Sequence, residues 1–217
     1  MTNIKRINLL SDDEVTDLYA RPDFNNDERK LYFTLDEQEQ IILNGYTNIK
    51  MQLYFILQLG YFKAKQQFFK FTFALVKEDV KFILKNHFKK NKSTGSSGSL
   101  SRYHIKKQQQ DILALFNYHE WSVEHTLQTK LQICELLRYY PKNHNALRQL
   151  LNYLEGQQII IPAYRKLQDV FTSALRSEEK RLNQIILAIP KRKQKQLSAL
   201  IVNKGMVQIK VTQHKKS

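Results

Sequence analysis

The sequence predicts an all-α fold of two helical units, helix-turn-helix-like bundles joined by a Gly/Ser linker. Only six glycines and four prolines are spread over 217 residues, too few for the many turns of a β protein. Apolar residues recur three and four positions apart in most segments, as they do on one face of a helix. A hydrophobic fraction of 42% is enough for a core and excludes low-hydrophobicity disorder over most of the chain.

One segment differs from the rest in composition: Lys92–Ser99, with the sequence KSTGSSGS. Gly and Ser dominate it, so we expect a flexible connector. It divides the chain into an N-terminal helical domain at 1–91, the linker at 92–99 and a second helical domain at 100–204. We expect residues 205–217 to form a frayed basic tail.

Capping side chains mark three helix starts in the first unit, at Ser11, Asp36 and Asn48. The helix after Asn48 is apolar on most sides. It is expected to be ended by Gly60 together with the aromatic cluster Phe68, Phe69, Phe71 and Phe73. A further amphipathic helix is expected over 80–88, from apolar residues at helical spacing. The core residues expected in this unit are Val15, Leu18, Leu53, Ile56, Val80 and Ile83.

The second unit is expected to contain helices over 103–116, 122–140, 145–155, 164–187 and 191–202. Pro141 and Pro190 end two of them, and Gly156 is expected to act as a C-terminal cap. The helix that begins at Ser122 should face the core with one apolar stripe: Val123, Leu127, Leu131, Cys134 and Leu137. The core residues expected here are Leu127, Leu131, Leu151, Leu167 and Phe171.

Charge is distributed unevenly along the chain. The first 40 residues hold ten Asp/Glu and five Lys/Arg, out of 20 and 35 in total, so the remaining residues hold 10 against 30. A local excess of 20 positive charges attracts polyanions, and nucleic acid is the usual polyanion. The alternative is a lysine-rich surface that serves only solubility.

The sequence carries no sign of catalysis, and we expect no enzyme, metal or cofactor. It has no glycine-rich phosphate loop, and its six histidines lack the spacing of a zinc site. The single cysteine, Cys134, cannot form an intrachain disulfide and is interpreted as a core residue. No signal peptide is evident, and the most apolar stretch, Met51–Phe62, is too short to span a membrane. We therefore expect a cytoplasmic protein.

The best DNA-binding candidates lie at the start of the helix over 103–116. Arg102, His104, Lys106 and Lys107 could neutralise phosphates, and Gln109 or Gln110 could reach an adenine edge in the major groove. A short turn and another helix follow, as in a helix-turn-helix reader of double-stranded DNA. The alternative is an ordinary solvent-exposed face.

Two further pairs are second-tier phosphate contacts. Lys63 and Lys65 lie within an aromatic-rich stretch, Tyr54–Phe73, that could also stack on single-stranded bases. The commoner explanation for that stretch is core aromatics with snorkelling lysines. Arg165 and Lys166 open the long helix that follows Pro162. The basic run 191–195 and the tail could hold phosphate without sequence preference.

Four stretches, in this order, resemble the N-terminal region of the Tn-three family of replicative transposases. They are LLSDDEVTDLYARP with ERKLYFTLDEQEQIIL; NIKMQLYFILQLGYFK; SRYHIKKQQQDILALFNYHEWS; and LNYLEGQQIIIPAYRKLQDVFTSAL. The fourth is the most specific, because an extended Ile-Ile-Ile-Pro piece precedes a long helix. The linker and the end of the chain, from about Asn203, depart from the family pattern.

The resemblance implies an all-helical DNA-binding region that recognises transposon terminal inverted repeats. In that family, strand cutting and joining belong to a separate metal-dependent domain, which we do not expect in this chain. The main alternative is a protein-interaction or regulatory module that partners a full-length transposase or a second copy. That alternative expects an exposed apolar patch. A third hypothesis, an unrecognised hydrolase, requires a cleft with convergent titratable groups.

Overall fold

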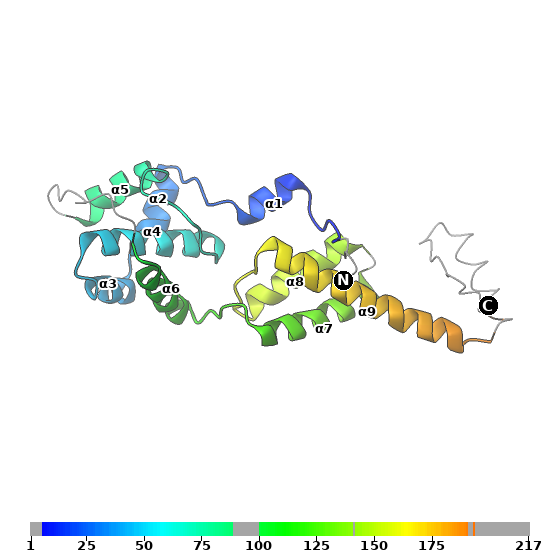
Figure 1. The fold of residues 1–217 in the computed structure, drawn as a ribbon. Coiled ribbons are helices and arrows are strands. Elements are labelled where there is room, and N and C mark those ends of the chain that lie inside the picture. The colour runs from blue at the N-terminus through cyan, green and yellow to red at the C-terminus, as the bar shows by residue number, and fades with distance from the viewer. Residues whose placement is uncertain (1–5, 89–99, 141, 191–192, 194–217) are drawn as a thin grey trace.

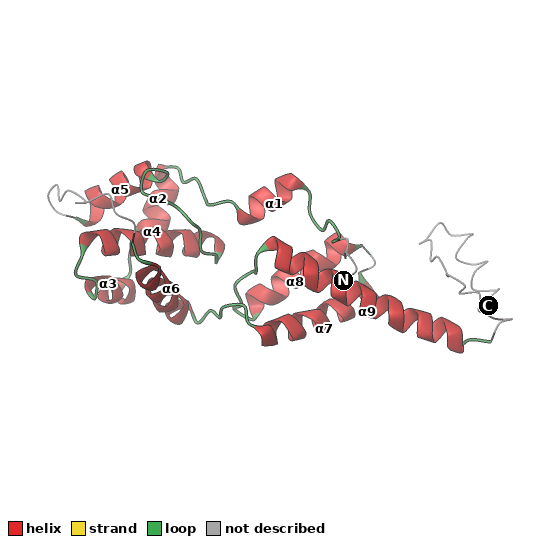
Figure 2. Ribbon diagram, viewed as in Figure 1, coloured by secondary structure: helices red, strands yellow, loops and turns green. Residues whose placement is uncertain are grey.

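The computed structural model describes residues 6–88, 100–140, 142–190 and 193. Within these residues all regular structure is helical, apart from one isolated bridge between His119 and Ile159 (Figure 2). The predicted all-α class is therefore confirmed. Four predicted features fall wholly or mostly outside the described residues: the linker 92–99, the break at Pro141, the helix over 191–202 and the tail 205–217.

Nine helices follow one another along the described residues (Figure 1). Their bounds are α1 Asp12–Tyr19, α2 Asn26–Phe33, α3 Glu37–Asn44, α4 Ile49–Lys65, α5 Lys77–His87, α6 Arg102–Phe116, α7 Val123–Tyr139, α8 Asn143–Gly156 and α9 Tyr164–Ala188. The caps predicted at Ser11, Asp36, Asn48 and Ser122 are all present.

One helix, α2, was not expected from the sequence. Its first turn is closed by a capping box in which the Asn25 side chain accepts hydrogen bonds from the backbone N–H groups of Asp27 and Glu28. The Glu28 carboxylate in turn accepts the N–H of Asn25. The same Asn-x-x-Glu spacing is visible in the sequence and would have indicated a helix start.

Helix α4 forms the centre of the first core. Every residue from Leu53 to Phe62 is buried, and α2, α3, α5 and α6 pack around it. The prediction that Gly60 ends this helix is wrong, because α4 continues to Lys65. Gly60 instead allows close approach of α2: a Cβ at this position would lie 2.4 Å from the ring of Phe33.

The first core confirms part of the predicted set and corrects the rest. Leu53, Ile56 and Ile83 are fully buried, and Val80 packs against the core while half-buried. Helix α1, by contrast, has no buried residues, and Val15 and Leu18 are only half-buried. Because α1 connects the two cores and lies beside both rather than under either (Figure 1), its apolar side is covered only in part.

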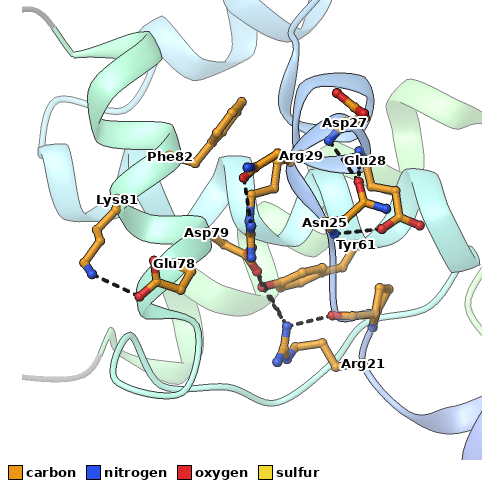
Figure 3. Close-up of polar contacts among 12 residues, drawn as sticks. Arg21, Asn25, Asp27, Glu28, Arg29, Tyr61, Glu78, Asp79, Lys81 and Phe82 are labelled. Atoms are coloured by element: carbon orange, nitrogen blue, oxygen red, sulfur yellow. Dashed lines mark hydrogen bonds and ion pairs between the residues drawn. The ribbon is translucent and has the colours of Figure 1, made fainter.

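A buried carboxylate ties three helices of the first core together (Figure 3). Asp79 of α5 accepts hydrogen bonds from Arg29 Nε of α2 at 2.7 Å and from the Tyr61 hydroxyl of α4 at 2.6 Å. Arg21 lies 3.6 Å from the same carboxylate and over the Tyr61 ring. Burial and the bond to Asp79 raise the pKa of Tyr61, so its hydroxyl remains a donor. Each charge is paired, which makes its burial tolerable.

Helix α6 follows the predicted linker but packs into the first core. Ile112 and Leu113 join that core. Two buried amides also connect α6 to α4, because Gln58 Nε2 donates to Gln108 Oε1 at 3.1 Å and Gln108 Nε2 donates to the carbonyl of Met51 at 2.8 Å. The boundary between the two cores therefore falls after α6. The division of the chain into domains at 92–99 stays a prediction.

Helices α7, α8 and α9 form the second core, in which Leu167 and Phe171 are fully buried and Leu151 is half-buried. The prediction that Leu127 and Leu131 belong to this core is wrong, because they are 62% and 63% exposed. The buried face of α7 is instead centred on Ile133, about a third of a turn from Leu127 at 3.6 residues per turn.

The exposed side chains of Val123, Leu127 and Leu131 form an apolar stripe on α7, which we call the α7 stripe. They are spaced four residues apart and so lie on one side of the helix. Cys134 lies on the same side about one turn beyond Leu131, where it is buried, as predicted, with its Sγ 3.6 Å from the carbonyl oxygen of Ala174.

The N-terminal segment closes on the last helix. The backbone N–H groups of Leu9 and Leu10 both donate to the Tyr164 hydroxyl at 3.1 Å, and Gln168 Nε2 donates to the carbonyl of Ile7. Leu9 is buried in the second core. The start of the described chain thus positions the first turns of α9.

The connection between α8 and α9 differs from its predicted form. Gly156 is the last residue of α8, and the left-handed conformation falls two residues later, at Gln158 with φ 53°. Gln158 then accepts the backbone N–H of His119, and the N–H of Ile160 donates to the carbonyl of His119. This pairing joins the α8–α9 connection to the α6–α7 connection.

The two helical glycines provide a matched test of the first core. Gly60→Ala is expected to destabilise the fold by about 1–3 kcal/mol, because the new methyl group overpacks against Phe33. Gly156→Ala meets no atom within 4 Å and should be neutral or stabilising by up to about 1 kcal/mol. Urea denaturation measures both free energies. Equal effects of the two substitutions would contradict the packing described for α4.

Candidate nucleic-acid interface

Helix α6 has one side in the core and one side in solvent. Its first turn is capped by Ser101, whose hydroxyl accepts the backbone N–H of His104. The buried side carries Gln108, Ile112 and Leu113. These contacts fix the rotation of the helix about its axis and so determine which residues face outward.

The outward side of α6 brings together most of the residues predicted there. Arg102, Lys106, Lys107 and Gln110 are exposed, together with Tyr103. At about 100° per residue, these five positions span roughly 140° of the helix surface. We call them the α6 face. His104 and Gln109 are only half-buried at its margins, so Gln110 is the better placed of the two candidate glutamines.

Two lysines of the α6 face already have carboxylate partners. Lys106 pairs with Glu120, and Lys107 Nζ lies 2.8 Å from Asp111 Oδ1. The bond to Asp111 raises the pKa of Lys107. Both pairs are solvent-exposed, and exposed pairs of this kind are weak enough to exchange for another anion. Arg102 forms no ion pair with any described residue.

Lys63 and Lys65, two of the predicted phosphate contacts, have intramolecular partners. Lys63 Nζ lies 2.7 Å from the Glu39 carboxylate, which is 2% exposed, and also donates to the carbonyl of Thr34. Lys65 Nζ donates to the carbonyls of Asp17 and Ala20 at the end of α1. These lysines hold α1 and α3 against α4, so we leave them out of the interface.

The aromatic residues of α4 are part of the core. Tyr61 and Phe62 are each 1% exposed and pack against other rings. This confirms the commoner explanation of the stretch, since rings that are buried among their neighbours cannot stack on nucleic-acid bases.

Arg165 and Lys166 are exposed in the first turn of α9, as predicted. Neither forms an ion pair with any described residue. They follow the buried Pro162, and Ala163 at the helix start provides no side-chain cap. Their positive charges therefore stand beside the positive end of the α9 dipole, a combination that favours a bound anion.

An ion-pair cluster locks α9 to α7. The Glu178 side chain is 9% exposed and accepts from Arg138 Nε at 2.9 Å and from Arg181 Nε at 2.6 Å. Burial raises the pKa of the Glu178 carboxyl, but the bonds to both guanidinium groups outweigh burial and hold it below its ordinary value of 4.5. The carboxylate is thus charged at neutral pH, and α9 is held firmly along α7.

The described residues contain no group of three side chains suited to a metal ion. A cavity of about 320 Å³ lies between α1, the end of α4 and α8, with Asp17, Lys65 and Glu155 on its walls. The Lys65 ammonium on this wall donates hydrogen bonds to the backbone carbonyls of Asp17 and Ala20. Among the described helices, none combines the length and apolarity needed to cross a membrane.

The fold and surface define a helical protein with cationic helix faces. Residues 9–174 match the family described as "Domain of unknown function (DUF4158)", and the chain belongs to that family. The match runs from Leu9, beside α9, to Ala174 within α9, so it includes residues of both cores. No curated protein matches the chain.

The Glu178 cluster predicts a specific pH dependence. Because the folded-state pKa of Glu178 lies below its ordinary value, its stabilising contribution is complete above about pH 4.5 and is lost as the pH falls through the folded value. The stability difference between the wild type and Glu178→Gln, measured by urea denaturation, should therefore shrink below about pH 4.5. Glu179→Gln, an exposed neighbour, is the control. A difference that stays constant with pH would contradict the role of the cluster.

Proposed function

We propose that this protein binds double-stranded DNA through the α6 face. One observation carries the proposal: the first core buries one side of α6 and leaves its cations and one glutamine together on the other side. The net charge of +15 supports it, since most of the basic excess lies beyond residue 40. Phosphate contacts by Arg102, Lys106 and Lys107 would position the protein on a duplex.

Gln110 is the residue best suited to read sequence within this face. A glutamine amide can donate to N7 and accept from N6 of an adenine edge in the major groove. The position lies among the phosphate-binding candidates, so contacts to the backbone would bring it to the groove. A short connection and α7 follow α6, as in a helix-turn-helix arrangement.

The proposed target is the terminal inverted repeats of a transposon. The four stretches that resemble the Tn-three family lie almost wholly within the segment 9–174 that matches the domain family. On this proposal the protein recognises DNA ends in the cytoplasm, and the strand chemistry of transposition is not performed by this chain.

Removal of the cations of the α6 face tests this function directly. For a labelled duplex titrated against salt, Arg102→Gln/Lys106→Gln/Lys107→Gln should reduce the slope of log affinity against log salt by about 2.7, which is roughly 0.9 for each lost phosphate contact. The control is Lys30→Gln/Lys77→Gln/Lys81→Gln on α2 and α5. It also removes three exposed charges, two of them ion-paired, and should leave the slope nearly unchanged. Equal slopes for the variant and its control would contradict the assignment of this face.

Removal of a competing carboxylate should have the opposite effect. Glu120→Gln releases Lys106 from its exposed ion pair. The ammonium then no longer has to leave a carboxylate before it meets its phosphate, so duplex affinity should rise several-fold while the salt slope stays nearly unchanged. Glu124→Gln, an exposed carboxylate without a described ion pair, is the matched control. A gain of equal size in both variants would reflect net charge alone.

A second function, as a protein-interaction module, is favoured by the α7 stripe. Three large apolar side chains exposed on one helix side are the kind of patch that marks contact with another protein. The partner would be a full-length transposase or a second copy. This alternative expects the wild type and the α6 variant to bind duplex equally weakly, so the titration described above separates the two functions.

A further inference from the structure

The longest helix of the described residues carries a second cationic surface. Arg165, Lys166, Arg176 and Lys180 are exposed on α9. At about 100° per residue they fall within roughly 100° of the helix surface, on the side away from Leu167, Phe171 and Ala174. We call these four residues the α9 stripe. The same core contacts that bury one side of the helix turn all four cations outward.

These cations differ from Lys106 and Lys107 of the α6 face in having no carboxylate partner. None of the four forms an ion pair with a described residue. Two of the three acidic residues of α9 are matched by arginines, Asp169 by Arg6 and Glu178 by Arg138 and Arg181. Glu179 is the third. The charge of the α9 stripe is therefore largely uncompensated.

The α9 stripe is long enough to bridge a duplex groove. At about 1.5 Å per residue, Arg165 and Lys180 lie about 22 Å apart along the axis. The major groove is about 12 Å wide, so long side chains that reach inward from both ends can meet phosphates on its two flanking strands. Figure 1 shows the later half of α9 extending beyond α7 and α8, which leaves this part of the helix open to a large partner.

The helix is also held firmly enough to present a fixed surface. Tyr164 and Gln168 bond to the N-terminal segment, and Glu178 bonds to Arg138 of α7. These contacts restrain α9 on the side opposite the stripe and near both groups of cations. A straight, restrained helix loses less conformational freedom on binding than a loop that carries the same charges.

We infer that the α9 stripe is a second duplex-binding site, in which Arg165 and Lys166 contact phosphates on one side of a groove and Arg176 and Lys180 contact phosphates on the other. This inference rests on the proposed DNA binding and deepens it, because each hydrophobic core then contributes its own DNA-contacting helix. The contacts go to the backbone, so they add affinity without choosing a sequence.

The test uses the full chain and the same labelled duplex. Arg176→Gln/Lys180→Gln removes two exposed charges that make no described contact with the core. It should reduce the salt slope by about 1.8, or roughly 0.9 per phosphate. The control Lys77→Gln/Lys85→Gln removes two exposed charges from α5 and should leave the slope nearly unchanged. Circular dichroism and thermal melting confirm that each variant is folded.

The outcomes separate this inference from the function on which it rests. A reduced slope for the α9 variant, with the same ranking of duplex sequences as the wild type, supports the inference. A slope equal to that of the α5 control overturns it, and the proposed function stands if the α6 variant still loses affinity. A wild type whose duplex affinity does not change with salt overturns both.

Discussion

The arrangement of the first core depends on one constraint, which is that α4 must be covered on every side. From Leu53 to Phe62 the helix has no exposed residue, so a single neighbouring helix cannot bury all of its sides. Gly60 lets α2 approach closely at one point, and α3, α5 and α6 cover the remaining sides. The position of α6, and with it the α6 face, follows from the need to bury α4.

Polar groups on α4 determine which helix covers which side. Tyr61 needs an acceptor for its hydroxyl and finds it in Asp79, which brings α5 and Arg29 of α2 to the same point. The Gln58 side chain donates its Nε2–H to Gln108 of α6. A buried polar group without such a partner would cost stability, so alternative packings are penalised. The same pairs hold Gln108 inside and leave Gln110 outside.

Local sequence patterns predicted where the helices begin, but they did not predict which side chains make contacts between helices. Caps at Ser11, Asp36 and Ser122 are formed by residues three positions apart, so the sequence contains the whole interaction. Glu39, the ion-pair partner of Lys63, lies 24 residues away in the sequence, and no local pattern predicts this contact. The prediction of which side of α7 is buried was wrong for a related reason. Its sequence has two apolar sides, one with Leu127 and one with Ile133, and only the tertiary contacts with α9 decide between them.

The charge balance of the two cationic helices suggests a division of work in the proposed complex. Lys106 and Lys107 on α6 must each leave a carboxylate before meeting a phosphate, so their net gain on binding is small. The α9 stripe has no such competition and would supply more of the salt-dependent affinity. The α6 face, with Gln110 among its cations, would then supply discrimination between sequences. On this proposal, α9 would bind the backbone of any duplex and allow the protein to slide, and the protein would bind longer where α6 makes base-specific contacts.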